Sequence, residues 1–346
     1  MVHREESFVD FGAPYDLSRT LSVLQRGRGD PAVQVDPGDY TRTAGGTPGA
    51  GAWLCRRVYG PGSEGSGTEL GQLTYRFDQL DASVVRVRAL ATSEQAAGAA
   101  VRSAPTLLGA DDDWGPLQQL LKARDDRTST LLARLRHRFP GLRLPATGAL
   151  FDQLVTATLE QKVTHGQARH TWRNLLRQHG ERPPTAAGLA PPQGMRLPLS
   201  GAQLKRVPSW QWHRMWVQPP LARTVLQVTQ RAGSIHRLAW ATGLSTSSVG
   251  ELAERLTAVP GVGPWTTAEA LQRSHGAADL PAVGDFHLAH FVGEALTGRR
   301  TDDDGMLELL EPFRPHRQRV VRLLGLSGFR HQRFGPRVAP EDHRQR

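Results

Sequence analysis

The sequence has one cysteine among its 346 residues and no long run of apolar residues. A single cysteine, Cys55, excludes an internal disulfide framework, a four-cysteine zinc site and a four-cysteine iron–sulfur cluster, and it is typical of a reducing cytosol. No apolar run approaches the roughly 20 residues that span a bilayer, and the first residues lack the apolar stretch of a signal peptide. These absences predict a soluble, cytoplasmic protein without a membrane partner.

Lysine is also scarce, although the chain is strongly basic. Lysine plus arginine number 43 against 33 acidic residues, for a net charge of +10, and the only lysines are Lys122, Lys162 and Lys205. A positive field of this size favours a polyanionic partner, nucleic acid before an anionic membrane. The length allows two or three domains, each with its own core.

The first part of the chain predicts a small α+β domain over residues 1–108. Residues 1–12 are expected to be an untethered lead. Three segments then alternate as strands do: Ala52–Tyr59, Gln72–Phe77 and Ser83–Arg88. An alanine-rich helix is expected from Ser93 to Leu107, so the unit forms around an antiparallel sheet.

From residue 109 to residue 335 the pattern is helical, apart from a Pro/Gly-rich loop over Glu181–Leu199. Residues 336–346 are expected to be a basic tail. The predicted helices are Leu117–Lys122, Thr128–Phe139, Thr147–Glu160, Gly166–His179, Leu221–Arg231, Ser234–Thr242, Ser248–Val259, Thr266–Ser274, Phe286–Leu296, Asp302–Leu310 and Arg317–Gly325.

A short glycine turn, Val259–Gly263, separates two of these helices. Ser248 with Glu251 has the capping-box pattern that would begin the first, and Pro264 suits the first position of the second. Two glycines allow a sharp turn and a close approach of the backbone to another surface. The unpaired N–H groups at the start of the second helix then predict a site for an anion such as phosphate.

With Asp285 following this turn, the chain resembles the helix–hairpin–helix DNA glycosylases, in particular the 3-methyladenine DNA glycosylase II (AlkA) type. The resemblance covers most of the chain. It is carried by Pro14–Ser18, Pro140–Pro145, Leu159–Thr164, the hairpin Val259–Thr266 and Leu280–Asp285. It implies an α+β protein: an N-terminal antiparallel sheet domain, then a mainly helical domain of two lobes with the active cleft between them.

The resemblance implies that Asp285 is catalytic. Breaking an N-glycosidic bond builds positive charge on the sugar, which a carboxylate beside C1′ stabilises while it orients or deprotonates water. The alternative is an N-cap aspartate that opens a helix at Phe286. Trp265 stands where lyase-competent relatives carry a Schiff-base lysine, which favours a monofunctional enzyme. As an aromatic residue, Trp265 either lines the base pocket or packs beneath the hairpin.

The same resemblance implies which residues grip DNA. Pro260, Gly261, Val262, Gly263 and Thr266 would hold the backbone at the hairpin. Gln161 or Lys162 would fill the gap left by a flipped base, although Lys162 is equally well explained as a solvated lysine. Members of this family often hold a monovalent cation on the turn carbonyls, and no organic cofactor is implied. The histidines show no metal-ligand spacing. Arginines near the C-terminus either contact phosphates or keep a helix soluble: Arg314, Arg317, Arg319, Arg322, Arg330, Arg333 and Arg337.

Two departures from the family concern the substrate. Gly325 replaces a stacking tryptophan, and Glu269 replaces a tyrosine, so the pocket of Trp265, Glu269 and Trp212 is expected to be rebuilt. Trp212 belongs to an aromatic cluster that either stacks on the base or packs in the core. We expect a monomeric, nucleoid-associated base-excision repair enzyme acting on alkylated purines in duplex DNA. The alternatives are a non-catalytic damage-recognising protein and an oxidised-purine glycosylase with lyase activity.

Overall fold

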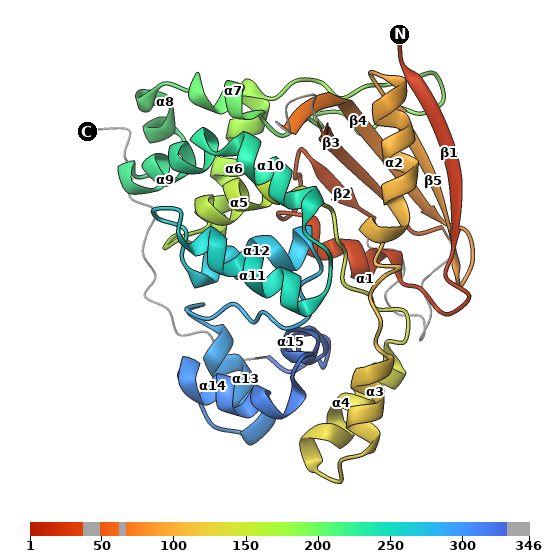
Figure 1. Cartoon of the computed structure of the whole chain (residues 1–346), viewed down its shortest axis with the longest axis vertical. Helices are drawn as coiled ribbons and strands as arrows, with labels where there is room; N and C mark the ends of the chain where they lie inside the picture. The colour runs from red at the N-terminus through yellow and green to blue at the C-terminus, as the bar shows by residue number, and fades with distance from the viewer. Residues whose placement is uncertain (37–48, 62–66, 331–346) are drawn as a thin grey trace.

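The N-terminal part of the chain forms a five-stranded antiparallel sheet in the computed structural model, which describes residues 1–36, 49–61 and 67–330 (Figure 1). The strand order is β1-β5-β4-β3-β2. The strands are β1 (His3–Asp10), β2 (Val33–Val35), β3 (Gly51–Pro61), β4 (Gly67–Gln79) and β5 (Val84–Ala91). The three predicted strands are thereby confirmed: two lie within β3 and β4, and the third, Ser83–Arg88, covers the first part of β5. The predicted basic tail, residues 336–346, lies outside the described residues.

The prediction that residues 1–12 are an untethered lead is wrong. Strand β1 pairs with β5 along its whole length, from His3 opposite Ala91 to Asp10 opposite Val84. Three consecutive charged residues, Arg4, Glu5 and Glu6, are exposed on this edge strand. Charged side chains protect an edge from pairing with other chains, and here they hide the alternation by which a strand is recognised.

Helix α2 (Glu94–Leu107) covers part of the sheet and packs against β1, β4 and β5. Its first turn is capped by Ser93, whose hydroxyl accepts a hydrogen bond from the Ala96 amide at 3.1 Å. Small buried residues such as Ala97 and Ala104 let the helix lie close to the sheet. The short helices α1 (Leu17–Leu21) and η1 (Ser22–Leu24) complete this core.

The rest of the chain forms two helical lobes, each with its own hydrophobic core. The first lobe contains α5 (Leu150–Leu159), α6 (His165–His179), α7 (Gly201–Lys205), α8 (Ser209–Arg214), α9 (Pro219–Gln230), α10 (Ala232–Ala241), α11 (Thr246–Thr257) and α12 (Pro264–Ser274). The second contains α3 (Gly115–Lys122), α4 (Arg127–Arg138), α13 (Leu288–Thr297), α14 (Asp303–Leu310), η2 (Glu311–Phe313) and α15 (Arg317–Gly325). The expected α+β architecture with a two-lobed helical part is confirmed.

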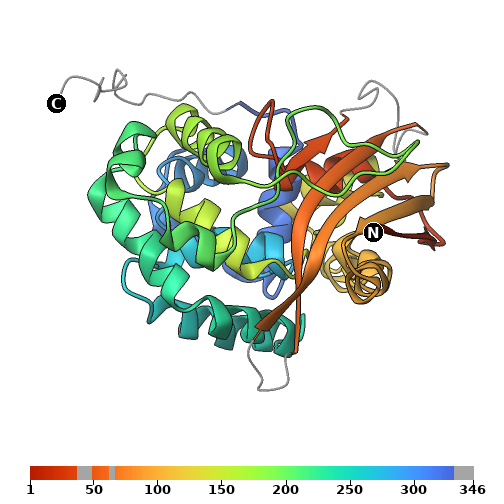
Figure 2. The ribbon, with the colours of Figure 1, turned by 90° about the horizontal axis from the view of Figure 1, so that it is seen from above.

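The second lobe is assembled from both ends of the helical region. Helices α3 and α4 precede the first lobe in the chain, whereas α13 to α15 follow it (Figures 1 and 2). Near this crossing the amide of Thr147 donates to the carbonyl of Arg273, and that of Gly148 to the carbonyl of Ser274. The chain therefore passes between the lobes twice, just before α5 and just after α12.

Several helix boundaries differ from the predictions. The cap of α11 is Ser245, whose hydroxyl accepts from the Ser248 amide, so the predicted capping box of Ser248 and Glu251 is wrong. Because adjacent serines share the same capping chemistry, the sequence alone does not say which one adopts the extended backbone of a cap. Helices α7 and α8, of five and six residues, were not predicted because they are too short to show periodicity. Over the described part of the chain, no helix is long and apolar enough to cross a bilayer.

Candidate active site

The hairpin turn between α11 and α12 is shaped by Gly261. Its φ is +85°, and a Cβ built on it would lie 2.2 Å from the Thr224 hydroxyl of α9. Only glycine tolerates both the left-handed backbone and this contact. Val262 is buried in the core of the first lobe, and its amide donates to the Val259 carbonyl at 2.9 Å. Pro260 and Gly261 are exposed at the tip.

The loop between α5 and α6 is fastened to this hairpin by Gln161. The side-chain amide of Gln161 donates to the Gly261 carbonyl at 2.9 Å and to the Thr266 hydroxyl at 2.7 Å. Thr266 is buried, and its hydroxyl accepts this bond. The next residue, Lys162, is exposed and has a φ of +52°. Of the two candidates for the gap-filling side chain, Gln161 is thus bound to the hairpin and Lys162 stands at the loop tip.

Asp285 receives three hydrogen bonds from N–H donors. Its Oδ1 accepts from the amides of His287 at 2.8 Å and Leu288 at 2.9 Å, and its Oδ2 accepts from the Trp265 indole at 3.2 Å. Because α13 begins at Leu288, the helix starts two residues later than predicted, and Asp285 holds its first amides. The capping role and the contact with the hairpin tryptophan are therefore made by different oxygens of one carboxylate.

The segment that carries Asp285 is fixed to α15 by a buried ion pair. Arg317 donates from Nε to Asp279 Oδ1 at 2.9 Å and from Nη2 to Asp279 Oδ2 at 2.8 Å. Gly284, with a φ of +88°, donates its amide to Asp303 on α14. Arg317 was predicted to contact phosphate or to solubilise a helix, and this is wrong. It is buried, as is Arg319, which is paired with Asp112.

The residues expected to line a base pocket lie in different environments. Trp265 is half-buried beside Asp285. Glu269 is paired with Arg273 at 2.8 Å, and Arg273 also donates to the Val23 carbonyl of the N-terminal domain. Trp212 is only 2% exposed and belongs to the core of the first lobe, which fits the packing alternative.

Phe286 was treated at the sequence level only as the start of a helix. In the structure it is 67% exposed and directly follows Asp285. Its ring meets that of His287 edge to face, with centroids 4.9 Å apart. A large exposed aromatic residue beside a carboxylate is unusual, because burial of such a ring is strongly favoured. The Gly-Asp-Phe-His context was the signal that would have drawn attention to it.

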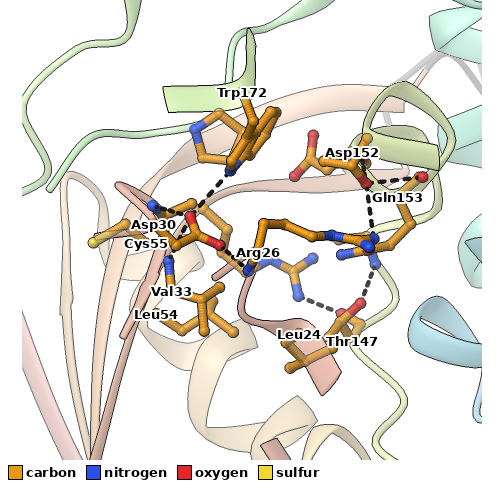
Figure 3. A pocket seen from close by; sticks show the side chains of 15 residues that line it. Leu24, Arg26, Asp30, Val33, Leu54, Cys55, Thr147, Asp152, Gln153 and Trp172 are labelled. Carbon is orange, nitrogen blue, oxygen red and sulfur yellow. Dashed lines mark hydrogen bonds between the residues drawn. The ribbon is translucent and has the colours of Figure 1, made fainter. Parts of the chain in front are cut away.

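Arg26 of the N-terminal domain lies among side chains of the first lobe, beside Gln153 (Figure 3). Arg26 is buried and donates from Nη1 to Glu160 at 2.9 Å and from Nη2 to Gln153 at 3.2 Å. Asp30, also buried, accepts from the Trp172 indole at 3.0 Å and from the Arg26 amide. Burial lowers the pKa of Arg26 and raises the pKa of Asp30. Glu160 directly precedes Gln161, so this network supports the loop next to the hairpin.

Two cavities lie between the sheet and the first lobe, of about 40 and about 180 Å³. Both are lined by Arg56, Thr147 and Asp152, and burial raises the pKa of the Asp152 carboxyl to about 6. Of the described residues that line them, none is Asp285 or Trp265. The candidate site is therefore defined by the hydrogen bonds around Asp285, and these cavities are a separate feature of the domain interface.

The described residues hold no group of three or more His, Cys, Asp or Glu side chains arranged for a metal ion. The hairpin offers carbonyl oxygens instead. The Gly261 carbonyl accepts one hydrogen bond from Gln161, and the Val259 carbonyl accepts one from the Val262 amide. Since a carbonyl oxygen has two lone pairs, each of these oxygens can accept a further contact, and a monovalent cation at the turn stays a prediction.

The fold is that of solved DNA glycosylases. The structure superimposes on a 3-methyladenine DNA glycosylase from Archaeoglobus fulgidus with a TM-score of 0.67 and 13% identity, covering 93% of this chain and 98% of that one. MBOgg1 in complex with a low-affinity DNA ligand superimposes with a TM-score of 0.59 and 12% identity, covering 95% of this chain and 98% of that one. An 8-oxoguanine glycosylase/lyase from Clostridium acetobutylicum in complex with double-stranded DNA superimposes with a TM-score of 0.57 and 10% identity, covering 94% of this chain and 97% of that one.

No protein-family model matches the sequence, and a search of curated proteins gives no match. The structural likeness extends over nearly the whole of each chain, so it includes the sheet domain and both lobes. At 10–13% identity it shows the shared fold. Activity has to be argued from the residues of the site.

Proposed function

We propose that the protein is a monofunctional base-excision repair glycosylase that removes damaged, alkylated purines from duplex DNA. The observation that carries this proposal is the position of Asp285. Its carboxylate is held by the amides of His287 and Leu288 at the start of α13 and by the indole of Trp265, which follows the hairpin turn. A DNA backbone bound at that turn would bring a flipped nucleotide to the carboxylate.

The chemistry requires stabilisation of a cationic sugar. As the N-glycosidic bond breaks, its electron pair leaves with the base and positive charge develops at C1′ and the ring oxygen. A carboxylate fixed by three donors stabilises that charge without reorganising. Water then bonds to C1′ and gives its proton to Asp285, which leaves an abasic site. An alkylated purine favours this path, because its cationic ring leaves as a neutral base.

The monofunctional character is inferred from Trp265. A lyase step needs a lysine amine that attacks C1′ and forms a Schiff base. Trp265 stands at that position, and its indole N–H is a donor without a nucleophilic lone pair. Lys122 and Lys205 lie on α3 and α7, and Lys162 lies at the exposed loop tip.

The grip on DNA is assigned to the hairpin and the neighbouring loop. The first turn of α12 presents unpaired amides that suit a phosphate, and a cation on the Val259 and Gly261 carbonyls would add a positive charge there. Lys162, at the loop tip, would enter the gap left by the flipped base. The protein would act as a monomer on duplex DNA in the cytoplasm, at the nucleoid.

The preference for an alkylated purine rests on its cationic ring, which is a good leaving group, because an open position on α15 departs from the pattern of the alkylpurine enzymes. A Cβ built at Gly325 meets nothing within 4 Å, and Gly325 is exposed. The family places a stacking tryptophan there, so this chain would accommodate a larger or less selectively held base. Glu269, the second departure, forms an ion pair with Arg273, so its negative charge is partly balanced before any base is bound.

The proposal is tested by single-turnover excision on a panel of duplexes, each containing one damaged base. Asp285→Asn should lower the rate of alkylpurine release at least about 100-fold, while duplex binding is retained. Asp304→Asn, an equal change of charge at an exposed position on α14, is the matched control. Undiminished excision by Asp285→Asn would remove Asp285 from its assigned role.

A second candidate function is non-catalytic recognition of damage, which the open space at Gly325 favours. It predicts tight duplex binding without release of any base from the panel. A lyase-competent oxidised-purine glycosylase, in contrast, would form a covalent enzyme–DNA adduct that borohydride traps. That adduct would contradict the inference from Trp265.

A further inference from the structure

A loop of the N-terminal domain, Gln25–Asp30, is joined to the exposed side of helix α6. Gly27 has a φ of +79°, which favours glycine, and it lies against the side chain of Arg169, whose Cδ would be 2.6 Å from a Cβ built on it. Arg173, one turn further along α6, donates to the Arg28 carbonyl at 3.3 Å. These contacts place the backbone of Arg28 beside the arginines of α6.

The positive charge of this surface is not neutralised by neighbouring carboxylates. Arg169, Arg173 and Arg177 recur every fourth residue of α6, a helix without an acidic residue. Within the part of the chain that the structure describes, none of them and no atom of Arg28 forms an ion pair. The carboxylates at the two flanks, Asp30 and Glu160, are occupied by Arg26 and Trp172. We call the four arginines, Arg28, Arg169, Arg173 and Arg177, the basic ridge.

The basic ridge is continuous with the hairpin. Arg26, two residues before Arg28, binds Glu160, and Glu160 precedes the Gln161 amide that is bonded to Gly261 and Thr266. Helix α6 begins at His165, three residues after the exposed Lys162. The chain therefore links the hairpin and the loop tip directly to the first turns of α6, and the bond between Arg26 and Glu160 links them to the N-terminal loop.

We propose that the basic ridge binds phosphates of the DNA duplex beside the lesion, so that the N-terminal sheet domain is part of the DNA-binding surface. Successive arginines on α6 are spaced by about 6 Å along the helix axis, and each DNA strand carries one charge per ~3.4 Å of its axis. The row can thus meet phosphates of more than one nucleotide. Because guanidinium groups contact phosphate without reading bases, this contribution is independent of sequence and of the lesion.

This inference rests on the proposed function for its ligand, and its test measures binding separately from excision. The affinity of the full chain for an undamaged duplex is measured as a function of salt concentration. For Arg28→Gln/Arg169→Gln we expect about 10-fold or greater weakening near physiological salt, and a log–log salt slope shallower by about 2. Arg28→Lys/Arg169→Lys, which keeps both charges, should retain most of the affinity.

The matched control is Arg102→Gln/Arg237→Gln, which removes two exposed arginines on α2 and α10, outside the basic ridge. It should leave the salt slope within the error of the wild type. Equal salt slopes for the ridge variant and the wild type would show that the basic ridge does not bind DNA phosphates. Excision by the wild type would still support the proposed function in that case. A shallower slope in the ridge variant without any excision by the wild type would support the ridge and overturn the function. No duplex binding by the wild type would overturn both.

Discussion

Gln161 illustrates how the residues of the site divide between local pattern and tertiary contact. The resemblance to the glycosylases predicted that it lies in a DNA-invading loop, from the contiguous stretch Leu159–Thr164. The structure adds that its amide is bonded to Gly261 and Thr266, 100 and 105 residues away. The ion pair of Asp279 and Arg317 was not predicted, because it too joins residues that are far apart in the chain. An arginine at the start of a basic helix has the appearance of a surface residue until its partner, 38 positions earlier, is placed beside it.

Removal of the Gln161 amide is expected to loosen the hairpin. Gln161→Leu deletes two hydrogen bonds and leaves the buried Thr266 hydroxyl without that donor, so the free energy of unfolding should fall by about 1–3 kcal/mol. Urea denaturation measures this. Gln178→Leu, at an exposed position on α6, should change stability by less than about 0.5 kcal/mol. Equal stability of Gln161→Leu and the wild type would show that the hydrogen bonds of Gln161 to Gly261 and Thr266 do not stabilise the fold.

At the scale of elements, periodicity predicted the longer helices and alternation predicted the three central strands. Strand β1 was missed because its charges belong to an edge, which is known only once the sheet order is known. Helices α7 and α8 were missed because one or two turns carry too little pattern. The start of α13 was misplaced because Asp285 holds the amides of the residues after Phe286.

Two glycines of adjoining elements should respond to alanine in opposite directions. In α11, Gly250 has open space around its Cβ position, so Gly250→Ala should stabilise the protein by about 0.5–1 kcal/mol. In the hairpin, Gly261→Ala meets Thr224 and an unfavourable φ, so it should cost more than about 1 kcal/mol and weaken duplex binding. Denaturation midpoints and binding isotherms of both variants provide the comparison. Stabilisation by Gly261→Ala would show that the turn relaxes freely.

At the scale of the whole molecule, buried histidines make stability depend on pH. Burial lowers the pKa of His236 and of His275 to about 4, whereas an unfolded histidine titrates near 6.5. Below about pH 6.5 the unfolded chain binds protons that the folded chain does not, so stability falls as the pH drops towards 4. Asp152 acts in the opposite sense, because its raised pKa of about 6 favours the folded state at low pH.

The contribution of one histidine is isolated by a variant. His275→Gln should lose less unfolding free energy than the wild type when the pH is lowered from 7.5 to 5, because Gln does not titrate. The exposed His165, in the variant His165→Gln, provides the control, which should follow the wild type. Urea denaturation at the two pH values measures the difference. A His275→Gln protein as acid-sensitive as the wild type would assign the effect to other groups.

The hydrogen bonds of Asp285 come from two separately packed cores. The amides of His287 and Leu288 lie at the start of α13 in the second lobe, whereas Trp265 stands on α12 of the first. Only the bond from Trp265 crosses between the lobes, so a shift of about an ångström between them would break that contact while the two amide bonds and every helix stay intact. Heating should thus abolish excision at a lower temperature than it melts the helices, and a ligand that clamps the lobes together should narrow that interval.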